Sequence, residues 1–424
     1  MAWPRNVGRP VYQVLNPREL LRLRGRRIGP AVARNVVLLG LVSLFTDISS
    51  EMVATILPLY LVYSLGFTPL QFGIVDGLQQ GAAALVRVAG GFAADRTRRH
   101  REVAAIGYGL SAFVRLGLLF VQSVSAISAI IFLDRTGKGI RTAPRDALIS
   151  LSSDRDSLGA SFGVHRALDT AGAMIGPLIA FGLLWLAPGD YDAVFVVSFA
   201  AALIGLAVLV LFVENRPVPV ADAAHVSLRA AARQLGRRRF GTLVAVAGAL
   251  AVFTVSDAFL FLALQRHLDF EARFLPLLFV GTAAAFMLLA IPVGRLADSV
   301  GRGRVFLAGY VPLLLAYGLL LLPSGGSAEV PLYLILLGLY YAATDGVLMA
   351  LASATLPPAL RGSGLALVVT ATSLGRLLAS ILFGTIWTWQ NVDTAIVAFG
   401  IGLVISMAFA AAALRLSPEP AAVE

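Results

Sequence analysis

The chain has 424 residues and a formal net charge of +10; 58% of its residues are hydrophobic and only 14% are charged. A soluble protein carries roughly 25% charged residues, so this composition indicates a membrane protein whose apolar side chains face lipid or other helices. The chain contains no cysteine, which excludes disulfides, thiol catalysis and cysteine-ligated metals. Its arginines gather in short loops without interleaved aromatic residues, so the positive charge does not indicate a nucleic-acid partner.

Apolar runs of about 20 or more residues predict membrane-spanning α-helices. The sequence contains twelve such runs, and we therefore predict an all-α polytopic membrane protein without a soluble domain. In chain order the predicted helices cover residues 35–64, 69–94, 101–123, 125–149, 159–187, 191–213, 240–265, 273–298, 303–323, 330–356, 362–388 and 392–415.

Arginine placement predicts the orientation of the chain, because positively charged loops stay in the cytoplasm. Arginines concentrate in the N-terminal tail and in the even-numbered connections, whereas the odd-numbered connections nearly lack them apart from Arg266 and Arg273. We therefore expect a multi-pass protein of a prokaryotic-type inner (cytoplasmic) membrane, with both termini in the cytoplasm.

The one long connection divides the predicted helices into two bundles of six. Its residues 226–240 predict either an amphipathic helix on the inner leaflet or a solvated linker. The predicted parts are a basic cytoplasmic tail at 1–33, a first bundle at 34–213, a basic linker at 214–239, a second bundle at 240–415 and a cytoplasmic tail at 416–424.

The first predicted helix carries two carboxylates, Asp47 and Glu51, one turn apart on one face. A charge at bilayer depth costs about 2.5–3.5 kcal/mol or more on insertion scales, so it marks function or paired structure. A close carboxylate pair suits a site that binds and releases a proton. The alternative is that one or both form structural ion pairs with the fourth or fifth helix.

The fourth predicted helix is the most charged span, with Asp134, Arg135, Lys138, Arg141 and Arg145 along it. Asp134 and Lys138 are in i, i+4 register and can pair. Arg135 and Lys138 are candidates either to hold a substrate or to exchange partners with the carboxylates of the first helix. Arg145 approaches the cytoplasmic face, and Arg141 and Arg145 are candidates to hold Asp95 at a cytoplasmic gate.

The fifth predicted helix carries His165 and Asp169 one turn apart. This spacing is compatible with half of a metal site, but such pairs more often hydrogen-bond to neighbouring helices, and we predict no metal. Asp169 therefore joins Asp134 and Arg135 as a candidate for proton coupling.

The second half carries fewer charges, namely Asp257, Asp345 and Arg376 in the seventh, tenth and eleventh predicted helices. All three fall near mid-depth. Tyr340 and Tyr341, in the tenth helix, offer stacking surface and hydroxyls for an organic ligand, or ordinary packing. Together with the lysine of the fourth helix, these five residues are the predicted lining of a substrate cavity.

Two short patterns recur about 200 residues apart. Each copy of the first ends a predicted helix before a burst of arginine, with Gly91, Asp95 and Arg96 in one copy and Gly294, Asp298 and Arg302 in the other. The second pattern pairs Phe181-Gly182-Leu-Leu-Trp185 with Phe383-Gly384-Thr-Ile-Trp387. Repeats related by an axis along the membrane normal are one architecture of secondary transporters, so the sequence predicts a duplicated bundle.

With these motifs the chain resembles the major facilitator superfamily over about residues 34–415. The family's loop 2–3 motif, G-x-x-x-D-[RK]-x-G-[RK]-[RK], is matched at Gly91, Asp95, Arg96 and Arg99, with Arg98 in place of a glycine. Its copy in loop 8–9 is matched at Gly294, Asp298, Gly301 and Arg302. The helix 4 motif R-x-x-x-G is similar to Arg135–Gly139, and the helix 5 antiporter motif is similar to Gly163, Gly172, Gly176 and Pro177 but departs at Ala180 and Phe181.

The resemblance implies two pseudo-symmetric six-helix bundles around a central cavity lined by helices 1, 4, 7 and 10. It implies a cytoplasmic gate, for which the predicted residues are Gly91, Asp95, Arg96, Arg141, Arg145, Gly294, Asp298 and Arg302. None of the matched motifs identifies a substrate.

We therefore predict a secondary active transporter, not an enzyme, that moves a small organic solute by alternating access. Proton-coupled efflux is the leading mechanism, and uptake or facilitated transport of an anionic metabolite is the alternative. The expected partners are the small-molecule substrate, protons and the lipid bilayer; we expect a monomer without a cofactor. A P-loop of the form G-x-x-x-x-G-K-[ST] is absent from the sequence, so nothing indicates ATP hydrolysis.

Overall fold

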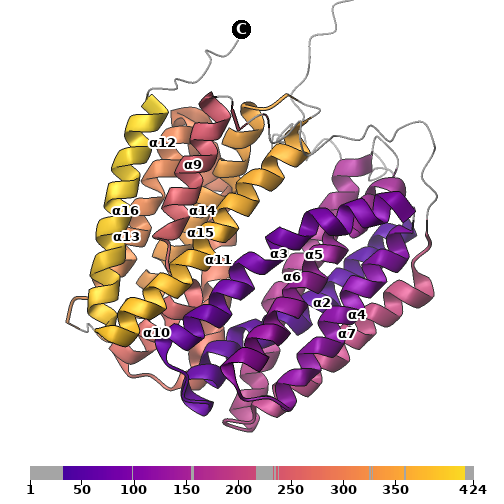
Figure 1. Ribbon diagram of the computed structural model, residues 1–424, viewed down its shortest axis with the longest axis horizontal. Coiled ribbons are helices and arrows are strands. Elements are labelled where there is room, and N and C mark those ends of the chain that lie inside the picture. The colour runs from indigo at the N-terminus through magenta and orange to yellow at the C-terminus, as the bar shows by residue number, and fades with distance from the viewer. Residues whose placement is uncertain are drawn as a thin grey trace, which may run out of the picture.

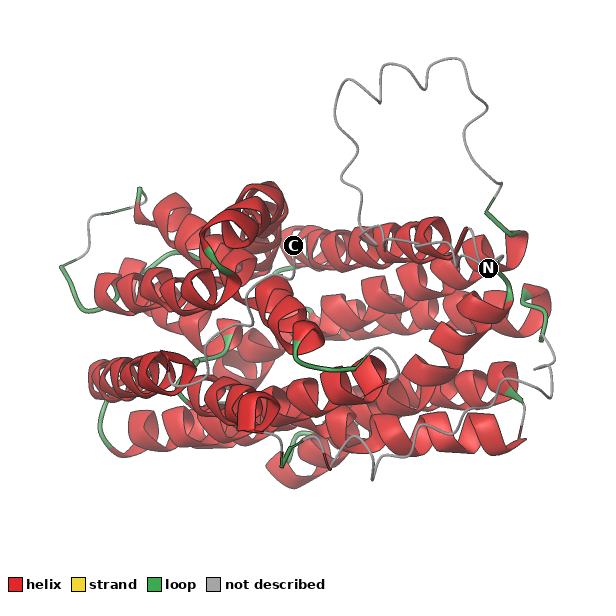
Figure 2. Cartoon of the chain, turned by 90° about the horizontal axis from the view of Figure 1, so that it is seen from above, coloured by secondary structure: helices red, strands yellow, loops and turns green. Residues whose placement is uncertain are grey.

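The computed structural model describes residues 32–97, 99–153, 157–215, 233, 235–236, 238–323, 326, 328–357 and 360–415, without side-chain detail at 85, 87–97, 238, 414 and 415. This part of the chain is built from helices and short loops and contains no strand (Figure 2). Most of the predicted tail at 1–33, most of the predicted linker and all of the tail at 416–424 lie outside the described residues.

The first half forms six spans, in agreement with the sequence prediction. They are α2 (Arg34–Leu59) continued by the π-helix η2 (Tyr60–Ser64), α3 (Pro69–Thr97), α4 (His100–Leu116) with the 3₁₀ turn η3 (Gly117–Leu119), α5 (Val124–Leu151), α6 (Leu158–Leu186) and α7 (Tyr191–Phe212). Ser123 and Asp190 begin α5 and α7, because their side chains accept hydrogen bonds from backbone N–H groups of the first turns.

The second half forms six more spans, two of which are interrupted. They are α9 (Arg238–Val252) with α10 (Asp257–Leu268), η5 (Ala272–Phe274) with α11 (Leu275–Val300), α12 (Arg302–Ala308) with α13 (Tyr310–Leu319), α14 (Glu329–Ala354), α15 (Arg361–Trp389) and α16 (Val392–Arg415). The predicted continuous helix at 240–265 is therefore wrong in one respect, since residues 253–256 leave the helical path.

Nine helical segments of the described chain are long and apolar enough to cross a membrane by length and composition. The three remaining spans depart from that pattern for visible reasons. The α5 span carries charges along much of its length, α3 contains polar residues at mid-length, and α12 and α13 are separated at Gly309.

The two halves of the chain form two bundles that lie side by side (Figure 1). Because the number of spans is even, α2 begins and α16 ends at the same face of the molecule, which we call the terminal face. In Figure 1 this is the upper end, where the bundles diverge, and they converge at the other end, which we call the opposite face. Both repeats of the glycine–aspartate motif, at the ends of α3 and α11, lie at the terminal face.

The turn between α11 and α12 shows why the second motif contains a glycine. Gly301 has φ +111°, a backbone conformation that residues with a Cβ rarely adopt. The turn leaves a single residue between the end of α11 at Val300 and the start of α12 at Arg302, with Asp298 and Arg302 in i, i+4 register. The corresponding turn of the first motif contains Arg98, which lies outside the described residues.

At the opposite face the bundles are joined by direct bonds between the halves. The Tyr63 hydroxyl donates to the Gln265 side-chain oxygen, and the Leu70 N–H donates to Thr388 Oγ1 at 2.7 Å. The larger helix contacts between the halves involve α3 with α15 and α11 with α6 and α2. These contacts close this face.

The repeated tryptophans account for the two arginines that break the charge rule for odd-numbered loops. Arg273 lies 4.4 Å from the ring centroid of Trp185, and Arg266 lies 4.9 Å from that of Trp387. Each guanidinium thus forms a cation–π contact with one copy of the repeat. The first contact also joins the two halves, because Trp185 is on α6 and Arg273 is on η5.

Candidate functional site

A cavity of about 380 Å³ lies between the two bundles. Its charged lining consists of three acids and three bases, which are Glu51, Asp76, Asp257, Arg135, Lys138 and Arg376. Its other polar lining residues are Gln79, Gln80, Thr254, Ser256, Tyr341 and Ser373. Both halves of the chain contribute, so any movement of one bundle relative to the other changes the shape of the cavity.

A chain of buried charges supports the cavity wall of the first half. Arg115 Nε lies 2.9 Å from Asp134 Oδ1, and Arg135 Nε lies 3.2 Å from Asp134 Oδ2. The three side chains are 5%, 9% and 4% exposed for Arg115, Arg135 and Asp134. Arg115 also donates to Ser49 Oγ at 2.6 Å. Asp134 therefore binds two guanidinium groups and orients Arg135 at the cavity.

Lys138 lies on α5 one turn from Asp134, and it is the only lysine of the chain. It lines the cavity together with Glu51 of α2. The predicted pairing of Lys138 with Asp134 does not form, because Asp134 is occupied by two arginines. Among the described residues Lys138 takes part in no ion pair, so its ammonium group is available to a ligand in the cavity.

A second polar group lies on the terminal side of this wall. The carboxyl groups of Asp47 and Asp169 lie within hydrogen-bonding reach of each other. Arg145 Nη1 is 3.8 Å from Asp169 Oδ1, and Arg145 Nη2 is 2.9 Å from Asp146 Oδ1. Asp47 and Glu51, predicted as one pair, thus have different surroundings: Asp47 faces α6 and Glu51 faces the cavity.

His165 and Arg141 are both engaged inside the first bundle. A hydrogen bond of 3.0 Å joins the His165 ring to the Ser43 hydroxyl. Arg141 lies 4.5 Å from the ring centroid of Tyr108. In the described part of the chain no group of three potential metal ligands occurs.

The cavity wall of the second half is built on the break between α9 and α10. The Val255 N–H donates to the Tyr317 hydroxyl at 2.8 Å, and that hydroxyl donates to the Phe253 carbonyl at 3.2 Å. Tyr317 therefore satisfies backbone groups that a continuous helix would pair internally. Ser256 caps α10 by accepting from the Phe259 N–H, and the start of α10 lines the cavity.

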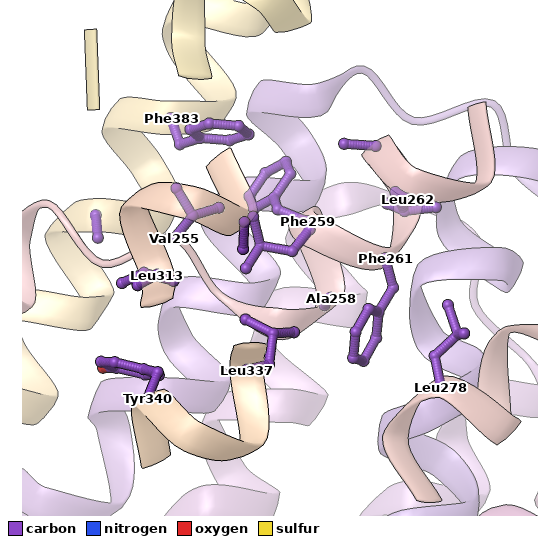
Figure 3. Close-up of a cluster of buried hydrophobic side chains, with 14 of the residues drawn as sticks. Val255, Ala258, Phe259, Phe261, Leu262, Leu278, Leu313, Leu337, Tyr340 and Phe383 are labelled. Atoms are coloured by element: carbon purple, nitrogen blue, oxygen red, sulfur yellow. The ribbon is translucent and has the colours of Figure 1, made fainter. Parts of the chain in front are cut away.

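Two tyrosines predicted to line the cavity have different positions. Tyr341 lines it, and its hydroxyl donates to Asp257 Oδ1 at 2.7 Å. Tyr340 is buried behind the wall, where its ring centroid lies 5.5 Å from that of Tyr310. Tyr340 belongs to the hydrophobic cluster shown in Figure 3, together with Leu313 and Leu337. Asp345 does not line the cavity, but its Oδ1 atom lies 3.7 Å from Nη2 of Arg376. Arg376 does line the cavity.

Aromatic packing lies next to the cavity, on the first turn of α10. The Phe259 ring centroid is 4.7 Å from that of Phe72 on α3 and 5.0 Å from that of Phe383 on α15. Phe259 and Phe383, both labelled in Figure 3, pack edge to face with an interplanar angle of 64°. Since Phe72 belongs to the other half, this packing helps to hold the two bundles together.

The sequence reasoning did not identify Asp76 and the serines around it as a site. Asp76 is buried on α3 and accepts a hydrogen bond from Ser380 of α15. A carboxylate within a predicted span is a signal for function. Its distant partners, Ser380 and Ser256, are ordinary residues that the sequence does not connect to it.

The comparisons with known proteins agree with this geometry. The family model described as Major Facilitator Superfamily matches residues 39–380 and, again, 258–424. The chain belongs to the Major Facilitator Superfamily. A relative in Methanocaldococcus jannaschii, an uncharacterized MFS-type transporter, is 31% identical over 372 residues, which cover 84% of this chain and 89% of the relative. An uncharacterized protein of Mycobacterium tuberculosis is 35% identical over 173 residues, 41% of this chain and 42% of that protein.

Solved structures of superfamily transporters share the fold. A crystal structure of the nucleoside transporter NupG has a TM-score of 0.77 at 16% identity and covers 90% of this chain and 100% of that one. A bacterial homolog of the human lysosomal transporter Spinster has a TM-score of 0.72 at 16% identity and covers 93% of this chain and 100% of that one. The predicted family and fold, twelve helices in two bundles, are therefore confirmed, and the chain is a multi-pass membrane transporter.

The residues that match the superfamily's loop motifs lie at the terminal face, away from the cavity lining. Gly91, Asp95 and Arg96 end α3, but their side chains lie outside the described residues. In the second copy Arg302 Nη2 is 2.8 Å from Asp298 Oδ1, and both side chains are exposed. The bundles diverge at this face (Figure 1), so a contact between the halves at these motifs belongs to a different conformation.

Proposed function

We propose that this protein is a proton-coupled secondary transporter that exports a small polar organic compound by alternating access. The observation that carries the proposal is the cavity between the bundles, which is lined by both halves and separated from the opposite face by the contacts of α3 with α15. We take the terminal face as cytoplasmic, since the arginine-rich connections lie there. In this orientation the structure corresponds to a cavity that opens toward the cytoplasm.

The lining favours a polar solute over a lipophilic one. Six charged side chains surround about 380 Å³, a volume near the lower end of ligand pockets. A purely apolar compound would remove these charges from water without pairing them, which is costly. Tyr341 adds an aromatic face and Asp257 a carboxylate on the second half, so a small compound with hydrogen-bonding or charged groups on both ends fits the walls.

Proton coupling is supported by the carboxylates of the first bundle. Two carboxyl groups within hydrogen-bonding reach, as in Asp47 and Asp169, share a proton because two adjacent negative charges repel each other. Arg145 lies beside Asp169, and Glu51 lines the cavity near Lys138. Loss or gain of a proton in this group changes the partners available to the basic residues, which links proton binding to substrate binding.

A second candidate function is uptake or facilitated transport of an anionic metabolite. Lys138 and Arg135 favour it, because both present positive charge to the cavity and Lys138 has no ion-pair partner among the described residues. The two functions differ in the direction of flux under an imposed proton gradient. An anionic substrate that accumulates inside vesicles oriented as in the cell would support the second.

The test uses purified protein in proteoliposomes, with a substrate identified by thermal-shift screening, since a ligand of the folded state raises apparent stability. We expect Glu51→Gln or Asp47→Asn to abolish accumulation driven by a pH gradient but to spare exchange of substrate down its own gradient. Asp393→Asn, an exposed carboxylate outside the cavity, is the matched control. Full gradient-driven transport in both α2 variants would show that these carboxylates are structural.

A further inference from the structure

Asp76 lies where the two bundles meet, and its carboxylate accepts a hydrogen bond from the other half of the chain. The side chain is 4% exposed. Ser380 Oγ on α15 donates to Asp76 Oδ2 at 2.5 Å. Ser256, at the break before α10, and Gln80, one turn along α3, are the other polar side chains near this carboxylate. Ser380 and Ser256 belong to the other half of the chain.

Close backbone contact between α3 and α15 makes the bond from Ser380 possible. A Cβ at Gly73 would lie 2.4 Å from the Ser380 carbonyl oxygen, and one at Gly77 would lie 2.8 Å from the Leu377 carbonyl oxygen. Both glycines share the face of α3 that carries Asp76. The missing side chains let the two helices touch, and this contact brings the Ser380 hydroxyl to the carboxylate.

The charges around Asp76 leave it without a basic partner among the described residues. The charged groups that line the same cavity are Glu51 on α2, Arg135 and Lys138 on α5, Asp257 on α10 and Arg376 on α15. In the described part of the chain, none of these groups forms an ion pair with Asp76. Of the other elements packed on α3, η2 contributes Tyr63, bound to Gln265, and α4 contributes Arg115, bound to Asp134.

We propose that Asp76 is a proton-binding site whose occupancy selects the face to which the cavity opens. The inference deepens the proposed function and rests on it. With the opposite face closed, Asp76 is buried between the bundles without a basic partner among the described residues, and burial favours the neutral acid over the charged carboxylate. When the bundles part at that face, water reaches the side chain and stabilises the ionised form.

This linkage has a direction. The state open to the terminal face, in which Asp76 is buried, favours the protonated form, and the state open to the opposite face favours the ionised form. Acid must therefore shift the equilibrium toward the state open to the terminal face. In a transport cycle Asp76 takes up its proton from the opposite face and releases it to the terminal face, so proton entry accompanies every return of the cavity.

The absence of cysteine makes the shift measurable without a substrate. One spin-label pair, at Ser64→Cys and Gln390→Cys, spans the halves at the opposite face. A second pair, at Ser150→Cys and Arg361→Cys, spans them at the terminal face. All four positions are exposed. Distances measured by double electron–electron resonance in lipid nanodiscs, as a function of pH, give the populations of the two states.

We expect acid to shorten the opposite-face distance and to lengthen the terminal-face distance. Asp76→Asn, which mimics the neutral acid, should favour the state open to the terminal face at every pH and lose this response. Ser380→Ala should move the midpoint to higher pH by on the order of one unit, because a hydrogen bond to a charged group changes an equilibrium by roughly tenfold or more. Thr370→Ala, also on α15 but outside the cavity lining, removes a hydroxyl that bonds within its own helix and should behave as wild type.

A wild-type pH response in Asp76→Asn would overturn the proposal, and so would an unshifted midpoint in Ser380→Ala, which retains the carboxylate should Asp76→Asn fail to fold. Either result leaves the proposed function intact, because coupling would then reside in Asp47, Glu51 or Asp169. The proposed function fails separately, if wild-type protein in proteoliposomes shows no transport driven by a pH gradient.

Discussion

The two halves repeat one helical plan, but they stabilise the cavity walls in different ways. In the first half Asp134 binds Arg115 and Arg135, and all three side chains are buried. In the second half the wall depends on hydroxyl groups, of which Tyr317 bridges the broken helix and Tyr341 binds Asp257. The cavity wall of the first half is therefore stabilised by buried charges, and the wall of the second half contains an interrupted backbone.

The difference bears on which wall can deform. A buried ion pair requires good geometry and offers few alternative arrangements, since each displaced charge loses its partner. A helix break held by one hydroxyl can change its dihedral angles with the loss of one or two hydrogen bonds. We therefore expect the first half to move as a rigid body and the region around residues 253–256 to absorb local changes.

The largest effect is expected for the charge network. Asp134→Asn leaves Arg115 and Arg135 buried without a carboxylate, and loss of one partner of a buried pair costs about 3–5 kcal/mol. Asp345→Asn, in the second half, breaks a 3.7 Å pair with Arg376 whose side chains are 56% and 33% exposed, and should cost about 1 kcal/mol or less. Thermal unfolding of both purified variants measures the contrast, and equal losses of stability would contradict it.

The helix break provides a test of the second wall. Tyr317→Phe removes the hydroxyl that binds the Val255 N–H and the Phe253 carbonyl, so buried backbone groups lose their partner at a cost of about 1–3 kcal/mol. Tyr333→Phe is the matched control, because the Tyr333 side chain is fully buried and its hydroxyl has no partner in the described chain. Denaturation midpoints should fall for the first variant only; a similar fall for Tyr333→Phe would mean that the loss comes from removing any buried hydroxyl and not from the backbone bonds at the break.

The same break shows where sequence reasoning reached its limit. Hydrophobic run length predicted all twelve spans, because burial in lipid constrains every residue of a helix. Residues 253–256 read Phe-Thr-Val-Ser and contain no glycine or proline. The hydroxyl that bonds to the backbone at the break belongs to Tyr317, which is more than 60 residues further along the chain. No local sequence pattern therefore predicts the break.

The candidate site was predictable to the extent that charge within a span is unusual. This signal led to Glu51, Arg135 and Lys138, which the structure places around one cavity. It did not lead to the role of Asp76, since its partner Ser380 is 304 positions away. It also could not distinguish Tyr341 from the adjacent Tyr340, because side-chain direction depends on how α14 packs.

The two walls can also be compared by exchanging lysine and arginine at one basic residue of each wall, Lys138 in the first half and Arg376 in the second. Lysine is a compact ammonium that can lose its proton, whereas arginine is bulkier and stays charged. We expect Lys138→Arg to reduce transport of the screened substrate by about tenfold or more, which corresponds to about 1.4 kcal/mol. Arg376→Lys should lose less, since a point charge can still pair with Asp345. Initial rates in proteoliposomes decide this, and full activity of Lys138→Arg would show that charge alone suffices.

The smallest change in stability is expected at the gate motifs. In this conformation Asp298 binds Arg302 of its own half, and both groups are exposed. Asp298→Asn should therefore change the free energy of unfolding by less than about 1 kcal/mol. We expect its effect, and that of Asp95→Asn, in the conformational equilibrium instead, because closure of the terminal face brings each motif toward an arginine or a helix N-terminus of the facing half.

The spin-label pair at the terminal face separates these two effects. Both variants should populate the closed terminal face less than wild type and should transport more slowly, with unfolding transitions that remain close to wild type. The comparison with Asp134→Asn is the sharpest control, since that variant should lose stability and the gate variants should not. Unchanged turnover in Asp95→Asn and Asp298→Asn, at matched expression, would contradict the gating role. The motif would then act only as a turn that ends a helix, in which Gly301 is needed for its positive φ.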